Sequence, residues 1–166
     1  MTGDVVSLLP STVGSDLVED GDDAGSRIVA LPVMHGADGF LLSLSCGLYP
    51  VTISDRSFHE FVFSVLIDWP DGEHLPMETQ DRSIVTYYLP AGLRAPMLDA
   101  VLQSCAVLLA DVEPRWIYRV TKHRNMPAKA MRKHDRITET MLSCGYGLLN
   151  EGLDPFARRF WILERL

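Results

Sequence analysis

The sequence has few cysteines, no basic residue near its N-terminus and no motif of a common catalytic site. The cysteines of the 166-residue chain are Cys46, Cys105 and Cys144, an odd number spread far apart. This pattern excludes a local zinc knuckle and argues against a disulfide framework. Cys105 and Cys144 fall on apolar faces of predicted helices, where thiols usually serve as small buried hydrophobes. We therefore expect a reducing compartment and a cytoplasmic protein.

The first 26 residues contain six Asp or Glu and no Lys or Arg. A secretory signal and a mitochondrial presequence both need basic residues, so neither is expected. The apolar run 5–10 suits a short strand or a strip that docks on a partner. The acidic stretch 19–23 lacks the ligand spacing of a calcium loop, which favours a solvated linker. We expect an acidic N-terminal arm at 1–26 and a single domain at 27–166.

Other functional signatures are missing as well. No uninterrupted apolar run approaches the roughly 20 residues that cross a bilayer, so we expect no membrane span. The five histidines show no metal-ligand spacing, so no metal site is expected. Neither a G-x-S-x-G nucleophile elbow nor a G-x-x-x-x-G-K-S/T phosphate loop occurs. The content of 47% hydrophobic and 22% charged residues is typical of a soluble globular domain.

Apolar periodicity predicts the secondary structure. Strands are expected at 27–34, 40–46, 83–89, 115–121, 146–150 and 158–163, and Pro32 places the first of them at a sheet edge or a bulge. Helices are expected at 96–112 and from about Pro127 to Cys144, where Gly145 supplies the C-terminal cap.

The segment 57–69 fits two structures. Ser57 and Glu60 form a capping box ahead of apolar residues at helical spacing, which favours a helix. Its aromatic and β-branched content would also suit a buried strand. We favour the helix. With it, strands and helices alternate through crossovers that need some parallel pairing, and the last two strands form an antiparallel hairpin. The fold class is therefore α/β or α+β, with a mixed central sheet and flanking helices.

Three local features occur along residues 83–164. A predicted strand ends at Leu89-Pro90 and leads through a short loop into an apolar helix. Asn125 lies between the next strand and helix, and Gly145-Tyr146 precedes the final hairpin. In this order the segment resembles the C-terminal half of the GNAT N-acetyltransferase superfamily. The resemblance implies an acetyltransferase-like fold, with acetyl-CoA as a possible cofactor held by residues Leu89, Arg94, Ala95 and Asn125.

The chain departs from the family pattern at the positions that carry its chemistry. The Q/R-x-x-G-x-G/A loop of the family has no glycine here after Arg94, and Pro96 removes one backbone N–H donor. Asp99 adds a negative charge to the first helical turn, where the phosphates would bind. Met141 stands where the family often has a tyrosine general acid, and Tyr118 and Tyr146 are expected to be packing residues. The resemblance therefore implies a degenerate member, and such members occur among bacteriophage and virion-associated proteins.

The segment 115–136 is strongly basic. It holds eight Lys and Arg against one Asp, a charge of +7, so the rest of the chain carries −14 within the total of −7. This segment is a solvated helix face, a site for a phosphate-bearing ligand, or a surface for an acidic partner, including the N-terminal arm of a neighbouring subunit. The acidic total makes nucleic acid the less favoured partner. The candidate interaction residues are Arg119, Lys122, Arg124, Lys129, Arg132 and Lys133.

Taken together, these features predict a non-catalytic interaction or structural protein with a protein partner or self-association. The alternative is an acyl-CoA-dependent N-acyltransferase.

Overall fold

The computed structural model describes residues 6–72 and 74–166. Over these residues the chain forms an eight-stranded mixed sheet in the order β1-β2-β3-β4-β6-β8-β7, with β5 also paired to β4. The strands are β1 (Val18–Asp20), β2 (Arg27–His35), β3 (Leu41–Ile53), β4 (Arg56–Asp68), β5 (Met77–Thr79), β6 (Trp116–Val120), β7 (Tyr146–Leu153) and β8 (Arg159–Arg165). The helices are α1 (Arg82–Tyr88), α2 (Arg94–Val112) and α3 (Ala128–Ser143), with short 3₁₀ turns at η1 (Ser15–Leu17) and η2 (Ala91–Leu93).

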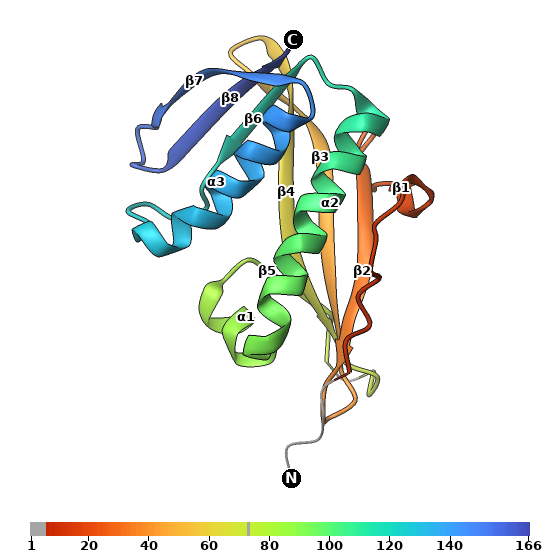
Figure 1. The fold of residues 1–166 in the computed structure, drawn as a ribbon. Helices are drawn as coiled ribbons and strands as arrows, with labels where there is room; N and C mark the ends of the chain where they lie inside the picture. Colours follow the sequence, from red (N-terminus) through yellow and green to blue (C-terminus); the bar gives the residue numbers. More distant parts are fainter. Residues whose placement is uncertain (1–5, 73) are drawn as a thin grey trace.

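The helices α2 and α3 cross the same face of the sheet and contact each other (Figure 1). The buried core lies between this face and the two helices. Alternate residues of β3 supply one side of it, and an apolar stripe of α2 supplies the other. The fully buried members include Leu42, Leu44, Leu48, Leu108 and Ile137.

The region 57–69 is a strand and not the helix that we favoured. It forms β4, which pairs antiparallel with β3 along its whole length, from Ile53↔Arg56 to Leu41↔Asp68. Ser54 and Asp55 have φ values of 48° and 64° and make the two-residue turn that joins the strands. Such a turn matches the twist of paired strands. The capping box of Ser57 and Glu60 does not form, because both residues lie on a strand.

The region 83–89 is a helix and not the predicted strand. The Asp81 side chain caps α1 by accepting a hydrogen bond from the backbone N–H of Ser83 at 2.8 Å. Helix α1 then ends at Tyr88, two residues before Pro90, which cannot continue a helix. The polar segment directly before α1 contains the short strand β5.

Most of the other secondary-structure predictions are confirmed. A mixed sheet is present, β2 has a bulge between Pro32 and Met34, and α2 and α3 lie where apolar periodicity placed them. Gly145 follows α3 with φ of 89°, a left-handed conformation that glycine adopts without strain. β7 and β8 form the expected antiparallel hairpin.

Two expectations about apolar segments can be compared with the structure. Residues Ala91–Val112 form a helical stretch that is long and apolar enough to cross a membrane by length and composition, with mean hydropathy 1.5. In the fold α2 packs on β2, β3 and α3, and the absence of a membrane span stays a prediction. The expectation that Cys144 is buried is wrong, because this residue caps α3 and is exposed. Cys46 and Cys105 are buried, and burial raises the pKa of both thiols, to about 12 for Cys46.

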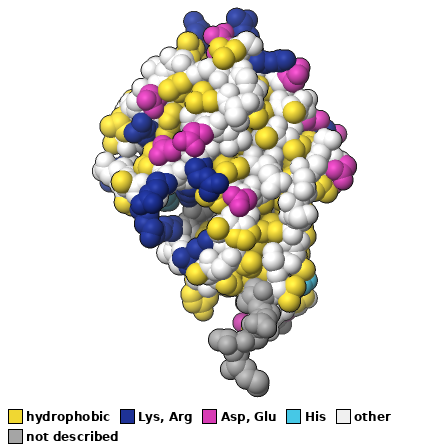
Figure 2. All heavy atoms as spheres, in the orientation of Figure 1, with side chains coloured by type: hydrophobic (Ala, Val, Ile, Leu, Met, Phe, Trp, Pro, Cys, Tyr) yellow, Lys and Arg dark blue, Asp and Glu magenta, His cyan; other side chains and the backbone are white. Residues whose placement is uncertain are grey.

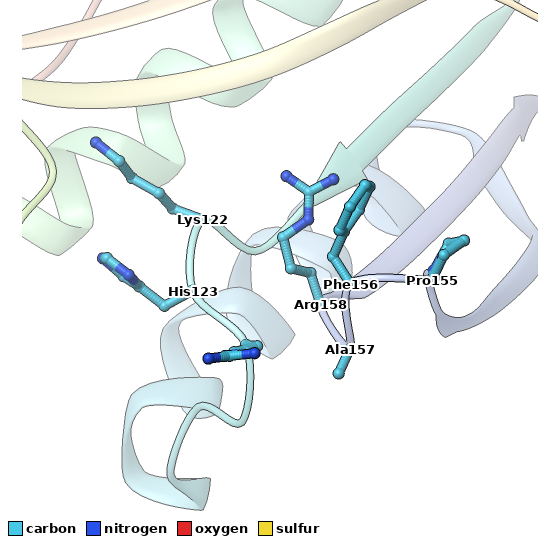
Figure 3. Close-up of a pocket in the computed structure, with 7 residues that line it drawn as sticks. Lys122, His123, Pro155, Phe156, Ala157 and Arg158 are labelled. Atoms are coloured by element: carbon cyan, nitrogen blue, oxygen red, sulfur yellow. The ribbon is translucent and has the colours of Figure 1, made fainter.

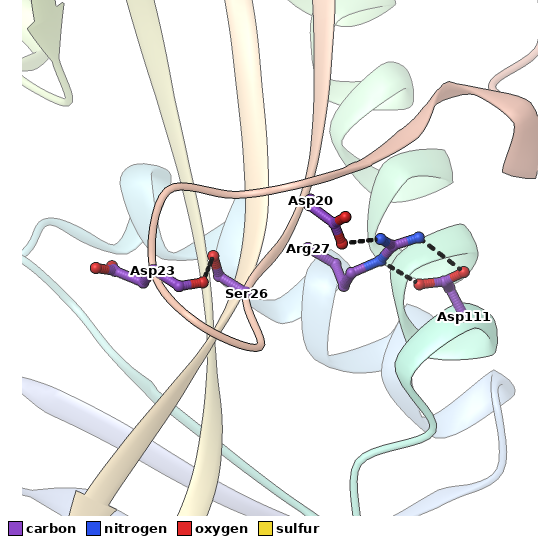
Figure 4. Close-up of polar contacts among 5 residues, drawn as sticks. All are labelled: Asp20, Asp23, Ser26, Arg27 and Asp111. Atoms are coloured by element: carbon purple, nitrogen blue, oxygen red, sulfur yellow. Dashed lines mark hydrogen bonds and ion pairs between the residues drawn. The ribbon is translucent and has the colours of Figure 1, made fainter.

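The described part of the N-terminal segment lies against the sheet and α2. Val13 is buried, and its backbone N–H donates to the Gln103 side chain at 2.9 Å. Strand β1 pairs with β2, and Arg27 joins Asp20 of β1 to Asp111 of α2 (Figure 4). Residues 6–26 therefore pack on the chain's own sheet. Residues 1–5, including Val5 of the apolar run, lie outside the described residues.

Candidate functional site

The sheet opens between β4 and β6. These strands are parallel and pair at two positions, His59↔Ile117 and Glu60↔Tyr118, after which they diverge. Strand β3 occupies one edge of β4 throughout, so β5 pairs with the edge that faces the opening, at Val65, Leu66 and Ile67. The chain therefore covers with its own backbone part of the edge of β4 that β6 leaves free.

Arg119 of β6 is buried on the helix side of the sheet, where it contacts α3 and β8. Its side chain donates to the His134 carbonyl at 3.2 Å and to the Thr138 hydroxyl at 2.8 Å, both on α3. Its guanidinium also lies 5.0 Å from the centre of the Trp161 ring on β8. Only 3% of Arg119 is exposed, and burial lowers its pKa to about 10. Arg119 is therefore a buried link between three elements, which corrects its prediction as a surface interaction residue.

His134 of α3 lies beside Arg119 and forms a buried layer with it. Its ring stacks on Trp161 with centroids 5.8 Å apart, and its centroid lies 6.5 Å from that of Phe63 on β4. Burial, followed by the charge of Arg119, lowers the His134 pKa to about 3. Its Nδ1 lies 3.1 Å from an Arg119 nitrogen, which can only donate. A neutral His134 thus accepts this hydrogen bond, and a ring–guanidinium layer spans the space from β4 to β8.

The unpaired cations of the protein gather near this layer. Six of the 15 Lys and Arg form ion pairs, and in the described part of the chain no carboxylate lies within 4 Å of the other nine. Eight of these nine lie in the first turn of α1 or α2, on strand β6, in the loop after β6, or on α3. The ninth, Arg56, lies at the start of β4. We call six of them the basic face, and Figure 2 shows Lys and Arg side chains clustered over the α3 side of the molecule. The basic face consists of Arg82, Lys122, Arg124, Lys129, Arg132 and Lys133.

Lys133 shows how strongly positive this region is. The side chain is half-buried, and its Nζ lies 5.3 Å from the centre of the Phe63 ring. Burial lowers its pKa, and the positive charge of Arg82 on α1 lowers it further. Two cations from separate elements therefore repel each other here without a neighbouring carboxylate, a charge arrangement that an anionic partner would stabilise.

An open hollow of about 510 Å³ adjoins the basic face, lined by residues 122–124 of the loop after β6 and 155–158 of the β7–β8 turn. In Figure 3 the side chains of Lys122 and His123 point away from Phe156. Arg158 is held in place by Asp154, with Nε to Oδ2 at 2.7 Å. The free charge at the hollow therefore comes from the loop after β6, and the turn contributes an exposed aromatic ring.

The four residues predicted to hold acyl-CoA lie on different elements. Leu89 is buried at the end of α1, whereas Arg94 and Ala95 are exposed in the first turn of α2. Asn125 is exposed in the loop before α3 with φ of 52°, as a turn former. No hydrogen bond joins these residues to one another in the ranges 6–72 and 74–166. Sequence reasoning missed Arg82 and β5, since a three-residue strand in a polar segment leaves no periodic signal.

Histidine, cysteine and acidic side chains do not gather in threes at any described position in a way that could hold a metal ion. Comparison of the chain with protein-family models, with curated protein sequences and with solved structures finds no match in any of the three.

Proposed function

We propose that this chain is a non-catalytic binding protein on an acetyltransferase-like topology whose acyl-carrier cleft is closed. Two observations carry the proposal: β5 pairs with the edge of β4 beside the opening, and the buried layer of Arg119 and His134 extends from Trp161 of β8 toward Phe63 of β4. The topology supports the acetyltransferase likeness, because β4 and β6 are parallel and divergent and β8 lies between β6 and β7.

The residues present do not fit an acyl-CoA. A carrier arm lying along β4 would meet β5, which already pairs with Val65–Ile67. The first turn of α2 has no side-chain cap, and Pro96 supplies no N–H donor to a pyrophosphate. Met141, at the position of the tyrosine acid in the resembled family, is fully buried and carries no transferable proton. A binding role therefore fits the site better than acyl transfer.

We expect millimolar acetyl-CoA to leave the melting temperature unchanged. A ligand at ten times its dissociation constant would stabilise the fold by about 1.4 kcal/mol, which raises the melting temperature of a chain of this size by roughly 3–5 °C. Differential scanning fluorimetry measures the shift. Adenosine 3′,5′-bisphosphate in a parallel titration separates recognition of the nucleotide from recognition of the acyl arm. A saturable shift with acetyl-CoA alone would restore the acyltransferase alternative.

The basic face supports an acidic protein surface as the partner. Its cations come from α1, the loop after β6 and α3, and no carboxylate within 6–72 or 74–166 forms an ion pair with them. Outside 115–136 the chain carries a charge of −14, so a uniformly charged nucleic acid would be repelled over most of the molecule. A protein can place its acidic residues opposite the basic face alone, which makes it the better match.

We expect the double variant Lys129→Glu/Arg132→Glu to bind a fluorescent 20-residue poly-glutamate peptide about tenfold more weakly. The matched control Arg56→Glu/Arg115→Glu changes the net charge equally at the starts of β4 and β6 and should bind within about twofold of wild type. Fluorescence anisotropy measures both, beside a 20-base-pair DNA probe. Equal losses of affinity in the two variants would mean that net charge alone causes the effect. Tighter binding of the DNA than of the peptide by the wild-type chain would indicate nucleic acid, and not a protein, as the partner.

A further inference from the structure

The C-terminal region, from the end of α3 through the β7–β8 hairpin, carries most of the exposed large apolar side chains of the described residues. Among the described residues, six of the ten exposed large hydrophobics lie within 142–166. Three of them, Leu148, Leu149 and Leu153, belong to β7 and are 43%, 58% and 69% exposed. The other three, Leu142, Phe156 and Leu166, flank β7 on α3, in the β7–β8 turn and at the C-terminus. Exposed apolar side chains that gather in one region of the chain point to an interface.

Strand β7 is also an open edge of the sheet. It pairs with β8 on one side, and no described strand pairs with the other (Figure 1). Its outward N–H and C=O groups can therefore accept a further strand. A bulge between Leu148 and Asn150 leaves Leu149 without a partner on β8. This edge is eight residues long and has neither the proline nor the lysine that commonly block such edges.

The opposite end of the sheet is protected. Strand β1 is three residues long and exposes Glu19 and Asp20. By contrast, Glu151 is the one charged residue of β7, and its carboxylate accepts from Arg159 at 3.0 Å, so the β7 edge is locally neutral. Pairing of β7 with β1 of another molecule would place apolar leucines against carboxylates. Pairing of β7 with itself meets no such repulsion.

We propose that β7 pairs antiparallel with β7 of a second copy, so that the sheet continues through a two-fold dimer. The antiparallel arrangement brings the leucines of one β7 against those of the other and satisfies the free backbone groups of both. Because the same surface serves both subunits and β1 accepts no strand, the assembly stops at two copies. This inference does not rest on the proposed function, since the basic face and β7 use different residues.

Size-exclusion chromatography with light scattering tests the dimer, in reductant so that the exposed Cys144 thiols cannot crosslink. The wild-type chain is expected at about twice its 18.5 kDa mass. The variant Leu149→Lys/Leu153→Lys should elute as a monomer, because it places four charges in the interface. The matched control Leu75→Lys/Tyr87→Lys alters two apolar residues elsewhere that are even more exposed, and it should stay dimeric.

Circular dichroism is used to check that both variants are folded, and amide hydrogen exchange is used to locate the interface. The outward N–H groups of β7 should exchange slowly in wild type and rapidly in Leu149→Lys/Leu153→Lys. A monomeric wild-type chain at 1 mM, or a Leu149→Lys/Leu153→Lys variant that remains dimeric, would overturn the proposal. So would a dimer whose β7 amides exchange freely, because another surface would then hold it together.

Discussion

Replacement of Arg119 by alanine is expected to lower the free energy of unfolding by about 3–4 kcal/mol. The substitution removes the hydrogen bonds to the His134 carbonyl and the Thr138 hydroxyl and leaves His134 Nδ1 without its donor. It also creates a cavity beside Trp161, because the surrounding strands relax only in part. Urea unfolding, followed by tryptophan fluorescence, measures the loss.

The matched variant Arg119→Met separates the two causes. Methionine keeps most of the volume and removes a charge whose burial is costly, so we expect it to lose less than half as much stability as alanine does. Equal losses in the two variants would assign the effect to the hydrogen bonds. A loss below about 1 kcal/mol for alanine would contradict the conclusion that Arg119 is a buried link from β6 to α3 and β8.

Arg119 also shows which part of the site the sequence could predict. The alternation of Trp116, Tyr118 and Val120 predicts correctly that these residues share one face of a strand. The same alternation puts Arg119 with Ile117 on the buried face, yet a count of charge along the chain includes it in the basic cluster. A buried guanidinium needs acceptors, and the acceptors of Arg119 lie on α3, some 15 to 19 residues away. Local sequence does not reveal them.

The fold was predictable where local signals agree with one another. Helix α3 has a polar start, an apolar stripe and Gly145 at its end, and each indicates the same boundaries. In 57–69 the aromatic and β-branched residues suit a strand, while Ser57 and Glu60 suit a helix start. Pairing with β3 decided between them, since it satisfies the backbone groups of 13 residues in β4. The turn at Ser54 and Asp55 that brings the two strands together lacks the Asn-Gly signal of a hairpin.

The basic face, like the fold, has one part that the local sequence reveals and one part that depends on distant contacts. The five cations from Lys122 to Lys133 are visible as a cluster in the sequence, and no carboxylate of the described residues forms an ion pair with any of them. Arg82 joins them, since its positive charge lowers the pKa of Lys133 on α3. Helix α1 follows directly on β5, which pairs with β4. A three-residue strand forms only against its partner, so neither β5 nor the position of Arg82 could be read from local periodicity.

Acidification from pH 7 to pH 5 is expected to remove about 2 kcal/mol of stability through His134 alone. Its pKa in the folded state is about 3, against 6.5 for an exposed histidine. The unfolded chain therefore binds one more proton than the folded chain between these values. The contribution of His134 is fully present above pH 6.5 and is lost at about 1.4 kcal/mol per pH unit as the pH falls toward 3.

The variant His134→Asn isolates this contribution, because its amide oxygen can still accept from Arg119 but does not titrate. Burial also lowers the pKa of His59 and raises that of Glu60, so both groups contribute to the pH dependence of stability. Both remain in the variant, and a comparison of the two proteins cancels their effects. Urea unfolding at pH 7, 6 and 5 should show the stability advantage of wild type over His134→Asn shrinking by about 2 kcal/mol. Parallel curves would mean that His134 is already accessible to protons in the folded state. The layer between β4 and β8 would then be open to solvent, and the closed cleft on which the binding role depends would lose its support.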